Sequence, residues 1–143
     1  MTGAGADTAT PPVVAELEWQ GGNRFVAHAG DVELTLDSPP EGAPTPVQAL
    51  VCALAGCMAI DVAVVMRRGR LPLRTLRVRV AAERAQTDPK RLLKVDLRFT
   101  LGGEIPADRV ERALALSREK YCSVWHSLRP DIELTTSYEL LPG

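Results

Sequence analysis

The sequence predicts a single α+β domain whose elements follow the order βββ-α-ββ-α-(α)-β. Three observations lead to this fold class. Several short stretches alternate apolar and polar residues, which is the period of a β-strand. One long, almost entirely apolar stretch carries helix start and stop signals. A later stretch repeats its apolar residues at the spacing of an amphipathic helix.

The first three elements are predicted to form an antiparallel meander. Alternation predicts strands at residues 13–20, 24–29 and 32–36. The first strand places Leu17 and Trp19 on one face, with glutamates on the other. Gly-Gly-Asn and Gly-Asp turn signals separate the three strands.

A helix is predicted from Pro46 to Arg68, after a proline-rich loop. Thr45 and Gln48 form a T-x-x-Q capping box, and Pro46 suits the first helical position. Gly69 is expected to end the helix, and Arg67 and Arg68 are favourably placed at the negative C-terminal end of the helix dipole.

This helix is apolar on almost every side. Its unbroken apolar stretch, 49–60, is too short for a membrane span, and Asp61 would be costly in a bilayer. A helix apolar all round has to be covered on every side. Because a chain of 143 residues can hardly do this alone, we expect a second subunit to help cover it.

The second half of the chain is predicted to alternate strands and helices. A hairpin is expected at 73–85 and 91–101, a helix from Pro106, a short helical piece at 122–130, and a strand at 131–141. The helix from Pro106 carries its inward stripe on Val110, Ala113, Leu114, Ser117 and Tyr121. The arginines of the hairpin alternate with apolar residues, which indicates a solvated sheet face rather than a nucleic-acid surface.

Composition narrows the class of protein further. The net charge of −1 and a pI near 6.1 argue against nucleic-acid or membrane partners. Residues 1–12 have no basic and apolar leader pattern, so we interpret them as a flexible tail and 13–143 as one domain. Three cysteines do not suit an extracellular disulfide framework, which favours a cytoplasmic protein with reduced thiols.

The three cysteines differ in their surroundings. Cys52 has apolar neighbours and is interpreted as core packing. Cys57 and Asp61 share a helix face at i, i+4. Cys122 stands at a helix junction beside Lys120, and both features favour its thiolate. His126, four residues on, would share the face of Cys122.

Spacing alone leaves four interpretations of these residues open. All three thiols could be core filler. Cys57 and Cys122 could be an attacking and a resolving thiol. The pairs Cys57/Asp61 and Cys122/His126 could hold a metal ion in a tetrahedral site. Finally, Cys122 and His126 could form an acyl-transfer pair.

Two segments resemble a known family. The stretches TPVQALVCALAGCMAIDV and SREKYCSVWHSL are similar to those of the OsmC/Ohr family of small thiol peroxidases. Within it they most resemble the YhfA-like branch, which carries G-C-x-x-I-D-V and E-K-Y-C-S-V. The resemblance extends from the strand of Trp19 to the strand of Tyr138.

The resemblance implies both a fold and an activity. The fold is an intertwined homodimer with antiparallel sheets around two central helices. The activity is reduction of organic hydroperoxides, with Cys57 as the attacking thiol and Cys122 as the resolving thiol. The family needs no metal or other cofactor, and its electrons come from dithiols, including lipoyl groups in some members.

The sequence departs from the family at the cation beside the attacking thiol. The peroxidases place an N-terminal arginine there, held by a glutamate near the start of the central helix. Val47 occupies that glutamate position, with Gln48 beside it. Arg24 is the candidate cation, and Asp61 and Glu119 are candidate holders of a cation. The missing glutamate favours an alternative function, a non-catalytic protein that binds an apolar ligand at the dimer interface.

Overall fold

A computed structural model describes residues 10–142 of the chain. Most of the predicted tail, residues 1–9, lies outside the described residues, and 10–12 are exposed and without regular structure. The described part divides into two compact units between Ala49 and Leu50. The elements follow the predicted order, so the α+β fold class is confirmed.

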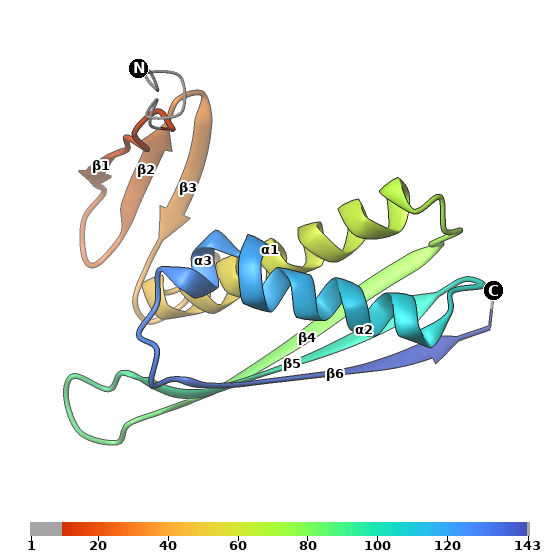
Figure 1. Cartoon of the computed structure of the whole chain (residues 1–143). Coiled ribbons are helices and arrows are strands. Elements are labelled where there is room, and N and C mark those ends of the chain that lie inside the picture. The colour runs from red at the N-terminus through yellow and green to blue at the C-terminus, as the bar shows by residue number, and fades with distance from the viewer. Residues whose placement is uncertain (1–9, 143) are drawn as a thin grey trace, which may run out of the picture. The chain divides into compact units, whose positions relative to one another are not determined.

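The first unit is the predicted antiparallel meander. Its strands are β1 (Glu16–Trp19), β2 (Phe25–Ala29) and β3 (Val32–Leu36), with β2 in the middle (Figure 1). Strand β1 is shorter than expected, since residues 13–15 remain outside the sheet. Leu17 pairs with Ala27, which in turn pairs with Leu34, so one face of the sheet is apolar across all three strands.

Among residues 10–49, no second layer covers that apolar face. Leu17 is 53% exposed, Trp19 66% and Val32 63%. Within residues 10–49, Ala27 is the only buried apolar residue. The sheet therefore has the sequence pattern of a half-buried layer without a core of its own.

Helix α1 (Pro46–Arg68) has the predicted bounds, and both of its ends are capped. The Gln48 side chain accepts a hydrogen bond from the Thr45 N–H at 3.0 Å, and the Thr45 hydroxyl accepts one from the Gln48 N–H at 3.1 Å. These two bonds are the expected capping box. At the other end, Arg70 takes a positive φ of 56°, and the N–H of Leu71 reaches the carbonyl of Met66 at 2.9 Å.

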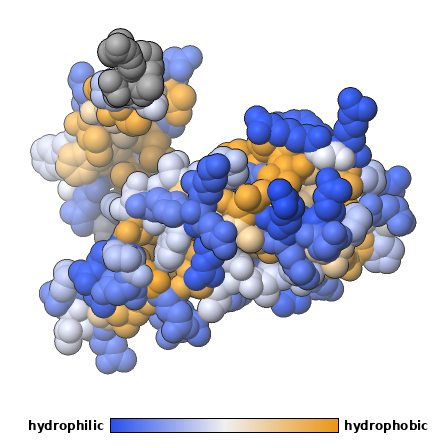
Figure 2. All heavy atoms as spheres, in the orientation of Figure 1, coloured by the Kyte–Doolittle hydropathy of each residue, from blue (hydrophilic) through white to orange (hydrophobic). Residues whose placement is uncertain are grey.

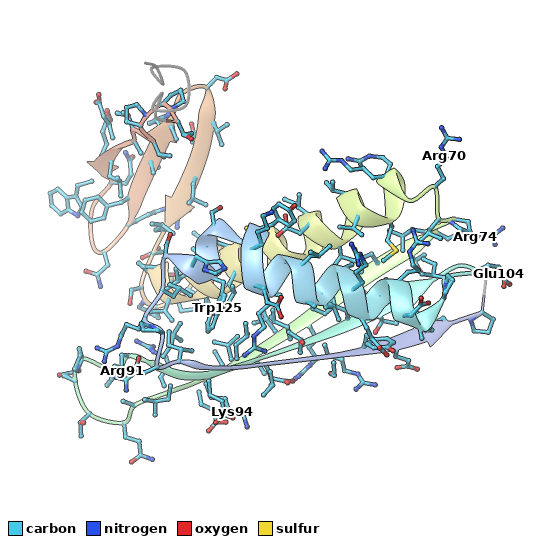
Figure 3. The ribbon with its side chains drawn as sticks, viewed as in Figure 1. Arg70, Arg74, Arg91, Lys94, Glu104 and Trp125 are labelled. Carbon is cyan, nitrogen blue, oxygen red and sulfur yellow. The ribbon has the colours of Figure 1, made fainter. Side chains whose placement is uncertain are left out.

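The second unit is a three-stranded sheet covered by helices on one face (Figure 1). Its strands are β4 (Thr75–Arg84), β5 (Leu92–Gly102) and β6 (Glu133–Leu141), and its helical pieces are α2 (Ala107–Leu116), the π turn η1 (Ser117–Tyr121) and α3 (Ser123–His126). Alternation on β5 turns Phe99 and its apolar neighbours toward the helices, where Phe99 is fully buried. Lys94 projects from the opposite face and pairs with Glu133 at 3.5 Å (Figure 3).

The sheet of this second unit is mixed, whereas an antiparallel sheet was predicted. Strands β4 and β5 form the expected antiparallel hairpin, but β6 runs parallel to β5. The helices between β5 and β6 return the chain to the end where β5 begins, and such a crossover produces parallel neighbours. After β5, Gly103 adopts φ 131°, where a side chain would collide with the carbonyl of Pro72.

One side of α1 packs into this unit and the other stays open. Leu54, Met58, Val62 and Met66 are buried, whereas Ile60 is 65% exposed. Figure 2 shows apolar side chains open at the surface among hydrophilic ones. By length and composition α1 could cross a membrane, but it is the core helix of a soluble fold. The prediction that Cys52 packs in the core is wrong for this chain, because Cys52 lies on the open side.

Candidate active site

Cys57 and Asp61 lie one turn apart on α1, on the side that faces the helical segment after α2. Both side chains are half-buried. The i, i+4 spacing places a thiol and a carboxylate next to each other along one helix face, as predicted. The fold then supplies the third member of the group from a distant part of the sequence.

Cys122 is placed by the π turn. Its backbone N–H bonds to the carbonyl of Ser117 at 2.8 Å, five residues back, which is the hydrogen bond that defines a π-helix. This wider turn brings residues five apart onto the same side, so Ser117 and Cys122 both face α1. It also rotates Tyr121 outward to 53% exposure, which corrects the prediction that Tyr121 lies on the inward stripe.

These elements bring two sulfurs and a carboxylate together. The Sγ atoms of Cys57 and Cys122 and a carboxylate oxygen of Asp61 all lie within 4.8 Å of one another. Both thiols are free. A disulfide needs its sulfurs about 2.0 Å apart, so the two thiols lie near each other and have to approach further to be linked.

A buried serine fixes the carboxylate. The hydroxyl of Ser117, which is fully buried, donates a hydrogen bond to Oδ2 of Asp61 at 2.7 Å. Ser117 was predicted only as part of the apolar stripe of its helix. A serine at a buried helix position needs a partner. That requirement is the sequence signal that could have revealed this bond.

The thiol of Cys122 is held in its protonated form. Burial raises the pKa of Cys122 to about 11, and a hydrogen bond with Cys57 and the nearby charges of Cys57 and Asp61 add to the effect. The N–H of Trp125 donates to Sγ at 3.4 Å. This hydrogen bond lowers the pKa of Cys122, but by less than burial raises it. The prediction that Lys120 and the helix junction favour the Cys122 thiolate is therefore wrong, because burial dominates.

Short helix α3 closes over this sulfur. Cys122 is its N-cap residue, and its side chain accepts a hydrogen bond from the N–H of Trp125, the third residue of the helix. Trp125 points from α3 toward the sheet, and the Arg118 guanidinium lies 6.0 Å from the centre of its ring (Figure 3). As a result, Cys122 is completely buried, whereas Cys57 is not.

Arg24 has a different carboxylate partner from those predicted. It lies just before β2 in the first unit, where it pairs with Asp37 at 3.0 Å and donates to the carbonyl of Glu41 at 3.1 Å. Among residues 10–142, neither Asp61 nor Glu119 forms an ion pair, so neither holds a cation. Asp37 lies close to Arg24 because β2 and β3 pair in the meander. The separation of the two residues along the sequence does not reveal this.

The other predicted residues lie outside the group of three. Gln48 uses its side chain in the capping box. Glu119 and His126 are exposed. The described His, Cys and acidic residues close enough to hold a metal ion are Cys57, Asp61 and Cys122, so the predicted fourth ligand, His126, is not assembled with them. For the acyl-transfer hypothesis, no hydrogen bond joins the Cys122 and His126 side chains among residues 10–142; the Cys122 sulfur accepts from the N–H of Trp125.

An apolar pocket opens beside the carboxylate. It has a volume of about 460 Å³ and is lined by Asp61, Val64, Val65, Arg68, Leu116 and Tyr121. Apart from the carboxylate and the guanidinium, its walls are aliphatic and aromatic. A pocket of this kind accepts an organic molecule with a small polar group better than it accepts a small hydrophilic one.

Comparisons with known proteins give a consistent result. Residues 38–137 match the family model described as OsmC-like protein. The chain is 32% identical to the protein YhfA of Escherichia coli strain K12 over 130 residues, which cover 89% of this chain and 97% of YhfA.

Solved structures share the fold. A hypothetical protein from Aquifex aeolicus superposes with a TM-score of 0.86 at 23% identity, over 94% of this chain and 99% of that one. An organic hydroperoxide resistance protein OsmC from Legionella pneumophila superposes with a TM-score of 0.69 at 18% identity, over 92% and 99% of the two chains.

Proposed function

This chain belongs to the OsmC-like protein family, and we propose that it is a thiol peroxidase that reduces organic hydroperoxides. The observation that carries the proposal is the group of two free sulfurs and a carboxylate within 4.8 Å. Only one of the two sulfurs is fully buried. A substrate can therefore reach Cys57 more easily than Cys122, which makes Cys57 the attacking thiol.

The reaction runs in two steps. The Cys57 sulfur attacks the terminal peroxide oxygen, the O–O bond breaks, and an alcohol leaves with the thiol proton, so that Cys57 becomes a sulfenic acid. The Cys122 sulfur then attacks Cys57, water leaves, and a disulfide remains. A dithiol, such as a lipoyl group, reduces the disulfide and restores both thiols.

Two observations support an organic substrate and a reducing compartment. The apolar pocket beside Asp61 offers aliphatic walls to the carbon chain of a peroxide. Free thiols suit a cytoplasmic location, which we propose for this protein. Among the structural relatives, the Legionella pneumophila protein is named for organic hydroperoxide resistance.

We also propose that the protein works as a homodimer. The apolar face of the β1–β3 sheet and the open side of α1 leave large apolar side chains exposed, among them Leu17, Trp19, Leu34, Leu50 and Ile60. Exposed apolar surface on a soluble protein marks an interaction site when its side chains gather on one face, as they do on the β1–β3 sheet. A second copy of the chain offers the same two surfaces.

The test is hydroperoxide consumption by the purified protein. Cumene hydroperoxide and a lipid hydroperoxide are supplied with dithiothreitol or dihydrolipoamide as the reductant. We expect turnover by the wild type and none above background by Cys57→Ser. The matched control is Cys52→Ser, which removes an exposed thiol outside the group and should leave turnover unchanged. Inactivity of the wild type toward both peroxides would refute the peroxidase.

One observation favours a non-catalytic alternative. Among the described residues no cation is paired with Asp61, and Arg24 is held by Asp37. Arg68 lines the same pocket as Asp61 but forms no ion pair with it, so within the described part of the chain no ion pair holds a cation beside the two thiols. In that case the pocket would simply bind an apolar ligand. An inactive wild type that still binds a fluorescent fatty acid, and loses it on Val64→Arg substitution in the pocket wall, would support this alternative.

A further inference from the structure

We propose that Asp61 removes the proton from the Cys122 thiol when the disulfide forms and delivers it to the oxygen that leaves Cys57. This inference rests on the proposed function, because it concerns the second step of that reaction. The geometry points to this role, since one carboxylate oxygen lies within 4.8 Å of both sulfurs.

The proton balance of this step is fixed by its chemistry. Cys57 enters as a sulfenic acid and Cys122 as a thiol. A bond forms between the two sulfurs while the S–O bond of Cys57 breaks. The thiol loses one proton and the departing hydroxide gains one to become water. One proton therefore has to travel from one sulfur to the oxygen on the other, and no external oxidant or reductant takes part.

Cys122 needs a base for this transfer. It is fully buried, and its pKa is raised to about 11, so the thiolate that attacks is scarce at neutral pH. Hydroxide from solvent has no direct access to a buried sulfur. A neighbouring acceptor that takes the proton during the attack removes this obstacle.

Asp61 is placed and oriented as such an acceptor. The buried Ser117 hydroxyl donates to its Oδ2 at 2.7 Å and so fixes the carboxylate plane. A carboxylate accepts up to four hydrogen bonds, so both oxygens can still receive a proton. A separation of up to 4.8 Å from sulfur is spanned by one water molecule or a small side-chain rotation. The pocket that Asp61 lines gives the released water an exit.

The other ionisable groups nearby do not fit. Glu119 and His126 are exposed and lie outside the group of three. Lys120 is also exposed, and an ammonium group has no acceptor. The charged groups that act on the Cys122 thiol are Cys57 and Asp61, both on α1.

The experiment compares Asp61→Asn with the wild type in two assays on the full-length protein. In the first, one equivalent of cumene hydroperoxide is added, and Cys57 sulfenic acid is trapped with dimedone. In the second, both proteins carry Cys52→Ser, because the exposed Cys52 thiol would also react. Cys57 is converted to a mixed disulfide with dithiobis(nitrobenzoate), and release of the second thionitrobenzoate reports the attack by Cys122. The second assay needs no peroxide, so it tests Asp61 even if the peroxidase proposal fails.

We expect Asp61→Asn to slow both disulfide-forming reactions by about 100-fold at neutral pH, with sulfenic acid accumulating in the first. The rate of the variant should rise about tenfold per pH unit, because without a base only the small fraction of Cys122 already present as thiolate can attack. If the substitution only disturbed the structure, it would slow the reaction but would not produce this tenfold rise in rate per pH unit. Asp108→Asn, an exposed carboxylate on α2, is the matched control and should behave as the wild type.

Two results separate the proposals. If Asp61→Asn forms both disulfides at the wild-type rate with the wild-type pH profile, the role of Asp61 is refuted while the peroxidase proposal stands. In the other result, peroxides do not oxidise the wild type, but Asp61→Asn slows release of thionitrobenzoate from the mixed disulfide. The peroxidase proposal is then refuted, and the role of Asp61 as the base for Cys122 is retained.

Discussion

The two units of the chain have similar strand patterns but very different interiors. Both contain a three-stranded sheet with one apolar face. In the second unit, helices cover that face, and Phe99, Leu97 and Leu101 are completely buried. In the first unit nothing among residues 10–49 covers it, and Trp19 is two-thirds exposed. A sheet pattern alone therefore does not create a core, because a core needs a second layer.

The difference extends to the charged groups. The first unit holds Arg24 in an ion pair with Asp37. The second unit holds the thiols and Asp61, whose nearest fixed partner is the neutral hydroxyl of Ser117. The second unit thus has a buried core and carries the proposed chemistry, whereas the first unit offers an uncovered surface. Three predictions test this contrast.

The largest effect is expected from the core of the second unit. Phe99→Ala removes a fully buried ring and should lower the free energy of unfolding by about 3–5 kcal/mol. Phe25→Ala in the first unit, where the ring is 38% exposed, should cost far less in the monomer. Urea denaturation measures both. In a Trp19→Phe background the fluorescence reports only Trp125, in the second unit. Equal losses for the two variants would contradict the contrast.

An intermediate effect is expected from pH. The pKa of Cys122 rises from its ordinary 9.0 to about 11 in the folded protein. Between these values the unfolded chain has lost the thiol proton and the folded protein still holds it, so stability falls as pH rises. A shift of this size corresponds to about 2–3 kcal/mol. Urea denaturation midpoints of the reduced protein measure this loss of stability. They are taken from about pH 8 to about pH 11, a range that spans the shift. Cys122→Ser should flatten the curve, and an unchanged slope would contradict the burial argument.

Substitutions on the apolar face of the first unit are expected to have the smallest effect on stability. They should, however, have a clear effect on assembly. Leu17→Lys changes an exposed apolar residue, so the second unit should lose no more than about 0.5 kcal/mol. If a second copy covers that face, the variant should shift the mass in solution toward the 15.5 kDa monomer. Sedimentation equilibrium measures this mass. Glu18→Lys, on the opposite face of β1, is the matched control, and equal effects of both variants would contradict the proposed interface.

The sequence predicted the local elements well because their signals are local. Helix α1 has the predicted bounds, since the capping box at Thr45 and the turn at Arg70 that closes the other end both act within a few residues. Strand β3 was also predicted residue for residue. The parallel pairing of β6 with β5 was not predicted, because register between distant strands leaves no short-range pattern.

The site was predictable in its members but not in its geometry. The Cys57/Asp61 spacing follows from helix periodicity, and the family resemblance indicated Cys122. The π turn changes the phase of the second helix by one residue, which no apolar repeat revealed. As a result Cys122 joins Ser117 on the inward side and Tyr121 faces outward. The ion pair between Arg24 and Asp37 depends on the antiparallel pairing of β2 with β3, which brings the start of β2 next to the end of β3.

The hydrogen bond from the Trp125 N–H to the Cys122 sulfur links backbone shape to oxidation state. When that sulfur turns to join Cys57, the first turn of α3 loses its cap, and a four-residue helix has little else to keep it wound. The oxidised molecule should therefore display a loosened segment next to the indole of Trp125. A reducing partner that binds this loosened segment would distinguish the oxidised protein from the reduced one before it contacts the buried disulfide.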